Sequence, residues 1–121
     1  MEQLIAAAAD TTPIDVNMDN FMAEVIDGSA KMPIVVQFWA PWCGPCKAIG
    51  PVLEQVAGER ELLVAKVDTD SNPMNAGRLG VRGIPALFLF RDGNLVSQKS
   101  GAMPKPQLLS WIDEYMTADD F

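Results

Sequence analysis

Two cysteines separated by two residues, Cys43 and Cys46, are the side chains of this sequence best suited to chemistry. They are the only cysteines in 121 residues, and the chain contains no histidine. Gly44 and Pro45 lie between them, and a proline at the start of a helical run would place Cys43 at a helix N-terminus. There the helix dipole and the free backbone N–H groups favour a thiolate. The pattern therefore predicts reversible thiol–disulfide exchange.

The two thiols are expected to have different roles in this exchange. Cys43 is predicted to be the nucleophile that attacks the disulfide of a partner. Cys46, one helical turn further along, is predicted to resolve the mixed disulfide that results. Both halves of an exchange cycle are then present in one short motif.

Other uses of a Cys-x-x-Cys pair fit the sequence less well. Zinc normally takes four Cys or His ligands, and this chain supplies two, so a metal or iron–sulfur site would have to borrow ligands from a second copy. A purely structural disulfide is the other alternative. Cysteine–histidine nucleophiles are excluded because the base is missing, and the sequence has no glycine-rich phosphate-binding loop.

The composition indicates a single globular domain spanning residues 1–121, with 49% hydrophobic and 21% charged residues. The net charge of −7 argues against binding to nucleic acid or to an anionic membrane. No apolar run approaches the roughly 20 residues that span a bilayer. The first ten residues lack the basic start of a signal peptide, so we expect a cytoplasmic protein, monomeric in solution. Residues 1–12 are expected to be an N-terminal extension and residues 117–121 a frayed end.

Hydrophobic periodicity and turn residues predict alternating strands and helices. A nearly continuous apolar run, Ile34 to Trp39, is expected to be a central strand buried on both faces and leads straight into the cysteine motif. The other expected strands are 13–16, 62–67, 86–90 and 95–100, and the expected helices are 17–27 ending at Gly28, 43–58 kinked at Pro51 and closed by Gly58, 73–79, and one from about Pro104. This order predicts an α/β fold in which helices cover both faces of a mixed sheet.

Three separated motifs together resemble the thioredoxin family, over about residues 14 to 116. They are the segment 38–47 around the cysteines, Val81-Arg82-Gly83-Ile84-Pro85, and Phe90-Arg91-Asp92-Gly93. The resemblance implies the thioredoxin fold, a five-stranded mixed β-sheet flanked by four helices. It also implies a general protein-disulfide reductase that binds no cofactor or metal itself. Thioredoxin reductase would recharge it with electrons from NADPH, and disulfide-bearing proteins would be its substrates.

The resemblance also assigns a substrate-binding surface around the nucleophile. Pro85 is implied to follow a cis peptide bond, which holds the Ile84 backbone ready to pair with an extended substrate segment. Trp42, Gly83, Ile84, Gly101 and Ala102 match the shallow apolar groove of thioredoxins. For Gly83 and Gly101 the alternative is that backbone geometry alone requires glycine.

One position departs from the family pattern. Gln37 stands where most thioredoxins carry a buried Asp that exchanges a proton with the resolving thiol. An amide cannot do this, so Cys46 must lose its proton to water, to Lys66 or to the departing substrate thiolate. Losing a buried negative charge is expected to ease ionisation of Cys43, to free Lys66 to stabilise a thiolate and to make the pair more oxidising. The alternative is that Gln37 fills a polar slot in the core, which requires hydrogen-bonded partners.

Two further functions stay open at this point. An oxidase or isomerase would use the same chemistry, favoured by Gln37 and disfavoured by the absence of an export signal. A thioredoxin-like co-chaperone, or a domain that holds clients through mixed disulfides, is the alternative from another class. Holding clients without either cysteine would distinguish that function from an enzyme.

Overall fold

Five strands form one mixed sheet in the computed structural model, which describes residues 10–116. The strands lie in the order β1-β3-β2-β4-β5. Parallel pairing joins β3 to both β1 and β2, whereas β4 runs antiparallel to β2 and to β5. The bounds are β1 Ile14–Asp15, β2 Ile34–Trp39, β3 Leu63–Asp68, β4 Ala86–Arg91 and β5 Asn94–Ser100. The predicted combination of parallel crossovers and a late antiparallel hairpin is confirmed.

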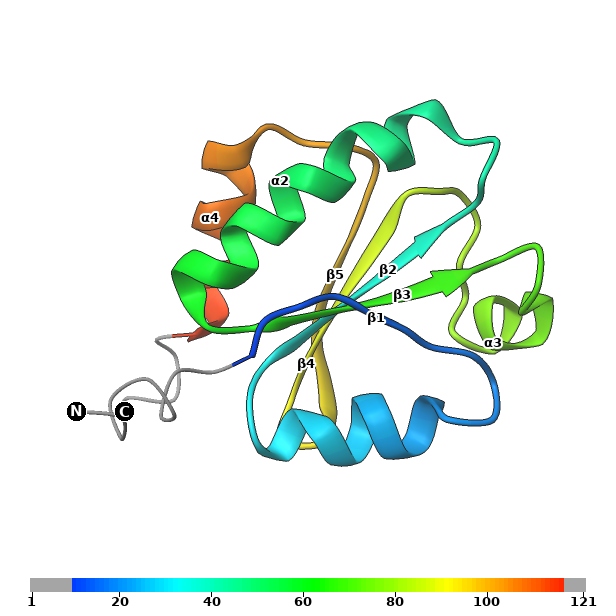
Figure 1. Ribbon diagram of the computed structural model, residues 1–121, viewed down its shortest axis with the longest axis horizontal. Coiled ribbons are helices and arrows are strands. Elements are labelled where there is room, and N and C mark those ends of the chain that lie inside the picture. The colour runs from blue at the N-terminus through cyan, green and yellow to red at the C-terminus, as the bar shows by residue number, and fades with distance from the viewer. Residues whose placement is uncertain (1–9, 117–121) are drawn as a thin grey trace.

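Helices cover both faces of this sheet (Figure 1). On one face lie α2, Gly44–Arg60, and α4, Lys105–Met116. The other layer contains the π-helix η1, Met22–Asp27, its continuation as a 3-10 helix η2, Gly28–Ala30, and the short α3, Pro73–Arg78. Each face buries its own apolar cluster, because successive residues of a strand point to opposite sides. The arrangement is the expected thioredoxin fold.

The central strand β2 is buried on both faces, as its apolar run predicted. Val36 and Phe38 belong to the cluster beneath η1, and Val35 belongs to the cluster beneath α2 and α4. Gln37 shares the side of Val35 and lies opposite Lys66 of β3 and Leu87 of β4. The strand ends at Trp39, four residues before Cys43. A central strand buried on both faces therefore leads directly into the cysteine motif.

The predicted helix over residues 17–27 is wrong at its start but right at its end, since η1 ends at Asp27 with Gly28 as its C-cap. The Asn17 side chain accepts hydrogen bonds from the backbone N–H groups of Asp19 and Asn20, and the Asn20 side chain accepts one from Asn17. These local bonds compete with a helical ladder, so residues 18–20 form a turn. Gly28 keeps right-handed helical dihedrals and continues the chain into η2.

The predicted end of the long helix at Gly58 is also wrong, because α2 continues to Arg60. Its cap is Glu61, a non-glycine residue with a φ of 53°. The last turn is tied to α4 by Arg60, whose Nε lies 2.6 Å from Asp113 Oδ1. This hydrogen bond raises the pKa of Arg60, because the carboxylate of Asp113 favours the charged guanidinium. The kink expected at Pro51, inside α2, stays a prediction.

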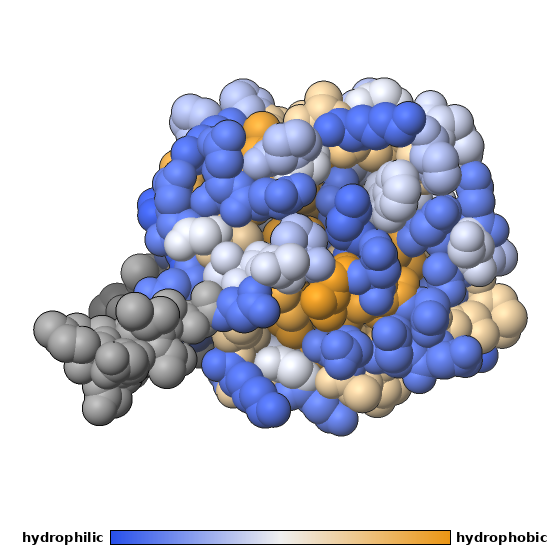
Figure 2. All heavy atoms as spheres, viewed as in Figure 1, coloured by the Kyte–Doolittle hydropathy of each residue, from blue (hydrophilic) through white to orange (hydrophobic). Residues whose placement is uncertain are grey.

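The surface seen in Figure 2 is mostly hydrophilic, with hydrophobic residues visible in its middle. Within residues 10–116, no helix has the length and apolar character needed to cross a membrane. Residues 10–12 precede β1 outside any helix or strand, and the rest of the expected N-terminal extension and the expected frayed end lie outside the described residues.

Leu53 is expected to be a main anchor of α2 on the sheet, because its side chain has no exposed surface. Replacing it with alanine should lower the free energy of unfolding by about 2–5 kcal/mol, through lost burial and a residual cavity. Urea denaturation of the wild type and of Leu53→Ala measures this. The neighbouring exposed Glu54→Ala serves as the control and should change stability by less than about 0.5 kcal/mol. Equal stabilities of the two variants would contradict the packing described here.

Candidate functional site

Cys43 is the N-cap of α2, as the sequence predicted. Its backbone is extended, with φ −91° and ψ 104°, and Gly44 and Pro45 begin the helix. The Sγ atom of Cys43 accepts a hydrogen bond from the backbone N–H of Cys46, at 3.2 Å. This N–H is one of the helical donors without a partner inside the helix, so the sulfur occupies the place where negative charge is best stabilised.

Cys43 and Cys46 are joined in a disulfide, with their Cα atoms 5.3 Å apart. Both are buried, with 4% and 1% of their surface exposed, and they pack with Ala40. Trp39 and Ile84 lie against this small cluster. The bond is thus formed by the only two cysteines of the chain, at a helix N-terminus and just below the surface.

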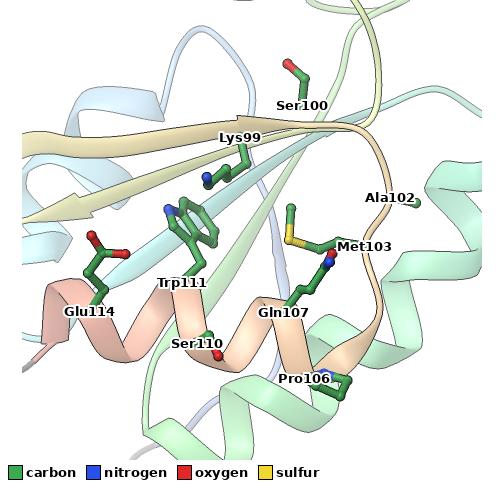
Figure 3. Close-up of a pocket in the computed structure, with 9 residues that line it drawn as sticks. All are labelled: Lys99, Ser100, Ala102, Met103, Pro106, Gln107, Ser110, Trp111 and Glu114. Carbon is green, nitrogen blue, oxygen red and sulfur yellow. The ribbon is translucent and has the colours of Figure 1, made fainter.

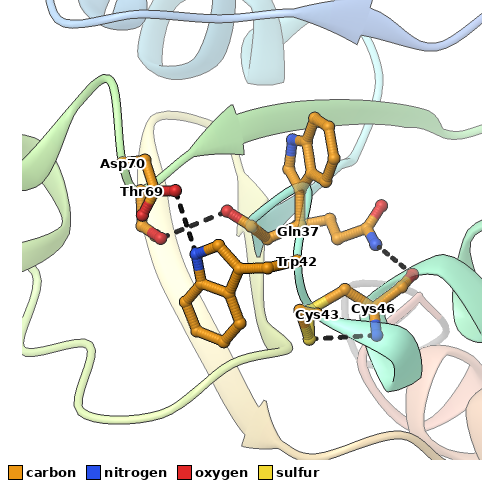
Figure 4. The surroundings of a disulfide bond; sticks show 7 residues. Gln37, Trp42, Cys43, Cys46, Thr69 and Asp70 are labelled. Atoms are coloured by element: carbon orange, nitrogen blue, oxygen red, sulfur yellow. Dashed lines mark hydrogen bonds between the residues drawn. A yellow bond between two sulfur atoms is a disulfide. The ribbon is translucent and has the colours of Figure 1, made fainter.

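An exposed indole lies directly before the disulfide. Trp42 is 69% exposed, and its Nε1 donates a hydrogen bond to Asp70 Oδ2 at 2.9 Å (Figure 4). The loop that carries Asp70 is fixed by Thr69, whose backbone N–H and Oγ1 both donate to the carbonyl of Trp39. Our sequence interpretation did not include Asp70. The signal available was its place just after β3, because parallel β2 and β3 end at the same edge of the sheet.

Gln37 is buried, with 2% of its surface exposed, and reaches the first turn of α2 from β2. Its Nε2 donates a hydrogen bond to the backbone carbonyl of Cys46 at 3.1 Å (Figure 4). The polar slot therefore has the hydrogen-bonded partner that burial requires. Lys66 is its neighbour on β3, but the described contact of the Lys66 ammonium is with Trp39, 4.8 Å from the ring centroid. The structure brings Gln37 to the backbone of Cys46 and places Lys66 over the Trp39 ring.

A shallow hollow of about 390 Å³ contains three of the predicted substrate-binding residues, Trp42, Gly83 and Ile84. Ile84 connects it to the disulfide, since this side chain also packs against the cysteine cluster. The peptide bond between Ile84 and Pro85 is cis, the geometry that the resemblance implied. The Gly101 N–H donates to the carbonyl of Pro85 at 2.8 Å, and the φ of +87° at Gly101 explains the glycine there.

Ala102 lines a different hollow from these residues. That hollow, about 620 Å³, lies between β5 and α4, where the Lys99 side chain points toward Trp111 (Figure 3). It is larger than the hollow formed by Trp42, Gly83 and Ile84, and neither hollow is lined by a cysteine. Within residues 10–116, no three His, Cys, Asp or Glu side chains are grouped so that they could hold a metal ion.

The fold and the site together define a class. A disulfide between two cysteines in a Cys-Gly-Pro-Cys motif, at the N-terminus of a helix that follows the central strand of a mixed sheet, is the redox-active centre of a thiol–disulfide oxidoreductase.

The particular family follows from comparison with known proteins. The family model described as Thioredoxin matches residues 12–114, and the chain belongs to the thioredoxin family. Thioredoxin C-2 of Corynebacterium nephridii is 43% identical over 105 residues, covering 85% of this chain and 95% of that protein. Thioredoxin 1 of Synechococcus elongatus is 42% identical over 98 residues, covering 79% and 90%. The structure of a mutant thioredoxin from Halobacterium salinarum has a TM-score of 0.81 and 34% identity, covering 90% of this chain and 95% of that one.

The chain is therefore a protein-disulfide oxidoreductase, and the predicted exchange chemistry is confirmed. Membership of the family implies disulfide-bearing substrates and a reductase as partners in general. The comparisons do not favour the client-binding alternative.

The bond between Trp42 and Asp70 should restrain the exposed indole. In Asp70→Ala the Trp42 N–H loses its acceptor, and its hydrogen–deuterium exchange, followed by NMR, should accelerate about twofold to tenfold. Asp70→Asn keeps an acceptor and should exchange at nearly the wild-type rate. The Trp111 indole, bonded to Ser97 at 2.8 Å, is the internal control. Unchanged exchange at Trp42 in the alanine variant would show that this bond restrains nothing.

Proposed function

We propose that this protein is a general reductase of protein disulfides, with Cys43 as the nucleophile and Cys46 as the resolving thiol. The observation that carries the proposal is the asymmetry of the pair: Cys43 caps α2 beside the hollow, whereas Cys46 lies one turn inside the helix and is the more deeply buried. Gly44 and Pro45, the residues between the cysteines, are associated in the family with reducing members.

The proposed reaction has two exchange steps. In the reduced protein, the Cys43 thiolate attacks one sulfur of a substrate disulfide, and the other substrate sulfur leaves as a thiolate. Cys46 then loses its proton and attacks Cys43 Sγ, so that the second substrate sulfur also leaves. Two electrons pass to the substrate, and the protein ends with the Cys43–Cys46 disulfide seen in the structure.

The hollow next to the disulfide is the proposed binding surface for an extended substrate segment. Trp42 and Ile84 would supply apolar contact, and the backbone of Ile84, before Pro85, would pair with the segment. Gly83 leaves the rim of the hollow open, since a Cβ there would meet nothing within 4 Å. Gly101 supports the Pro85 carbonyl, and Ala102 would contact only substrates that extend toward α4.

The partners proposed beyond the substrate follow from the family. A thioredoxin reductase would return electrons from NADPH to the Cys43–Cys46 disulfide, so the protein itself would need no bound cofactor. The acidic chain, with a net charge of −7, is proposed to act as a monomer in the cytoplasm and to bind neither nucleic acid nor membranes.

Steady consumption of NADPH tests the proposal. With thioredoxin reductase and a disulfide-bonded protein substrate, the wild type should turn over continuously. Cys43→Ser should abolish turnover, since the attacking sulfur is gone. Cys46→Ser should also abolish turnover but should accumulate a mixed disulfide with the substrate, detectable by mass spectrometry under non-reducing conditions.

Two outcomes would overturn parts of the proposal. If the wild type does not turn over although a chemical dithiol reduces its disulfide, the protein is no thioredoxin-reductase-dependent reductase and an oxidase role gains support. If the mixed disulfide accumulates in Cys43→Ser instead of Cys46→Ser, the two cysteines have the opposite roles.

A further inference from the structure

Gln37 is a polar side chain in an otherwise apolar layer, between the sheet and α2. It shares its side of β2 with Val35, which packs in the same cluster as Ile49 and Leu53 of α2. A buried amide in such a place is costly unless its polar atoms find partners. The described partner is the backbone carbonyl of Cys46.

The direction of this hydrogen bond is fixed by chemistry. A carbonyl oxygen can only accept, so the amide nitrogen of Gln37 must face it, at 3.1 Å. The carbonyl belongs to the first turn of α2, the turn that also holds Cys43 as its N-cap. One end of the bond is on the buried central strand β2, and the other is on the residue predicted to resolve the mixed disulfide.

From this geometry we propose that Gln37 is a positioning residue for the resolving step: its amide holds Cys46 in place through a donor that keeps the same protonation state at every working pH. The inference rests on the proposed function, in which Cys46 attacks a mixed disulfide at Cys43. Gln37 touches no reacting atom and acts only through the backbone of Cys46.

The resolving step requires a specific geometry, which is why a hydrogen bond that holds Cys46 in place matters. Cys46 gives its proton to water, its thiolate attacks Cys43 Sγ, and the substrate sulfur leaves as a thiolate that takes up a proton from water. The three sulfur atoms must come into line, so a small displacement of the attacking residue slows the reaction. Once the disulfide to the substrate replaces the internal one, the backbone of the first turn has to keep Cys46 close to Cys43.

The charged and titratable groups near Gln37 come from the elements packed against it. They are Lys66 on β3 and the two cysteines at the start of α2, whereas its neighbour on β4 is Leu87. The side chain of Gln37 is not ionisable, so it adds no titratable group to this set. A carboxylic acid at position 37 would add a titratable group. In its ionised form it would repel both the Cys46 carbonyl and the attacking thiolate.

The test is the release of two nitrothiobenzoate groups when the reduced protein reacts with dithiobis-nitrobenzoate, followed by stopped-flow absorbance. The first release reports attack by Cys43. The second is unimolecular, independent of reagent concentration, and reports attack by Cys46. Gln37→Met, similar in length but without a donor, should slow the second release about threefold to tenfold at every pH and leave the first within about twofold.

Gln37→Glu adds a second measurement, the pH dependence of the second release, which a merely structural role of Gln37 would not change. The neutral acid can donate its O–H to the Cys46 carbonyl, so at low pH the second release should match the wild type. As pH rises through the pKa of the introduced carboxyl, which burial raises, loss of the donor should make the ratio of variant to wild-type rate fall. A carboxylate that instead accepts the proton of Cys46, as the Asp of most thioredoxins does, would make this ratio rise. Gln107→Met and Gln107→Glu, the same changes at an exposed site on α4, should leave both releases unchanged.

The outcomes separate this inference from the proposed function. A wild type that releases only one group would refute resolution by Cys46 itself. A normal wild type together with a second release in Gln37→Met equal to that of the wild type would overturn the positioning role. So would a rate ratio in Gln37→Glu that stays constant or rises with pH. Circular dichroism and thermal melts of the variants establish that the compared proteins are folded.

Discussion

The hydrogen bond between the Cys43 sulfur and the backbone N–H of Cys46 is the interaction on which the site depends. It exists because Cys43 stands at the N-cap of α2, and α2 stands where it does because its apolar side is buried against the sheet. The same bond that caps the helix also places the Cys43 sulfur at the positive end of the helix dipole. Folding and reactivity therefore rest on one short stretch of backbone.

The sequence was most informative where a strong local pattern agrees with the tertiary structure. The run Ile34 to Trp39 is β2 to the residue, because a strand buried on both faces must be apolar throughout. The β4–β5 hairpin follows its turn residues, with Asp92 and Gly93 both at positive φ. The N-cap position of Cys43 could be predicted because Pro45 marks the start of a helix.

The sequence was least informative where a contact joins segments far apart in the chain. The last turn of α2 is joined to α4 by the hydrogen bond between Arg60 and Asp113, a contact that no periodicity reveals. Trp111 of α4 is buried, and its Nε1 donates a hydrogen bond to Ser97 of β5, a contact that no local pattern in the sequence reveals. The hydrogen-bond partner of Gln37 could not be predicted either, since it depends on which turn of α2 packs over Gln37 of β2. The need for a partner could be predicted, but its identity could not.

The depth of the Cys43 sulfur has a consequence for which partner disulfides can react. Only 4% of the residue is exposed, so a partner can reach the sulfur from a narrow range of directions. A partner disulfide that is recessed in its own fold cannot meet it until that fold opens locally. Reactivity then reports the local stability of the partner as well as the chemistry of its sulfurs. With Cys43 as the proposed nucleophile, its burial would thus favour accessible partner disulfides over the buried structural disulfides of well-folded proteins.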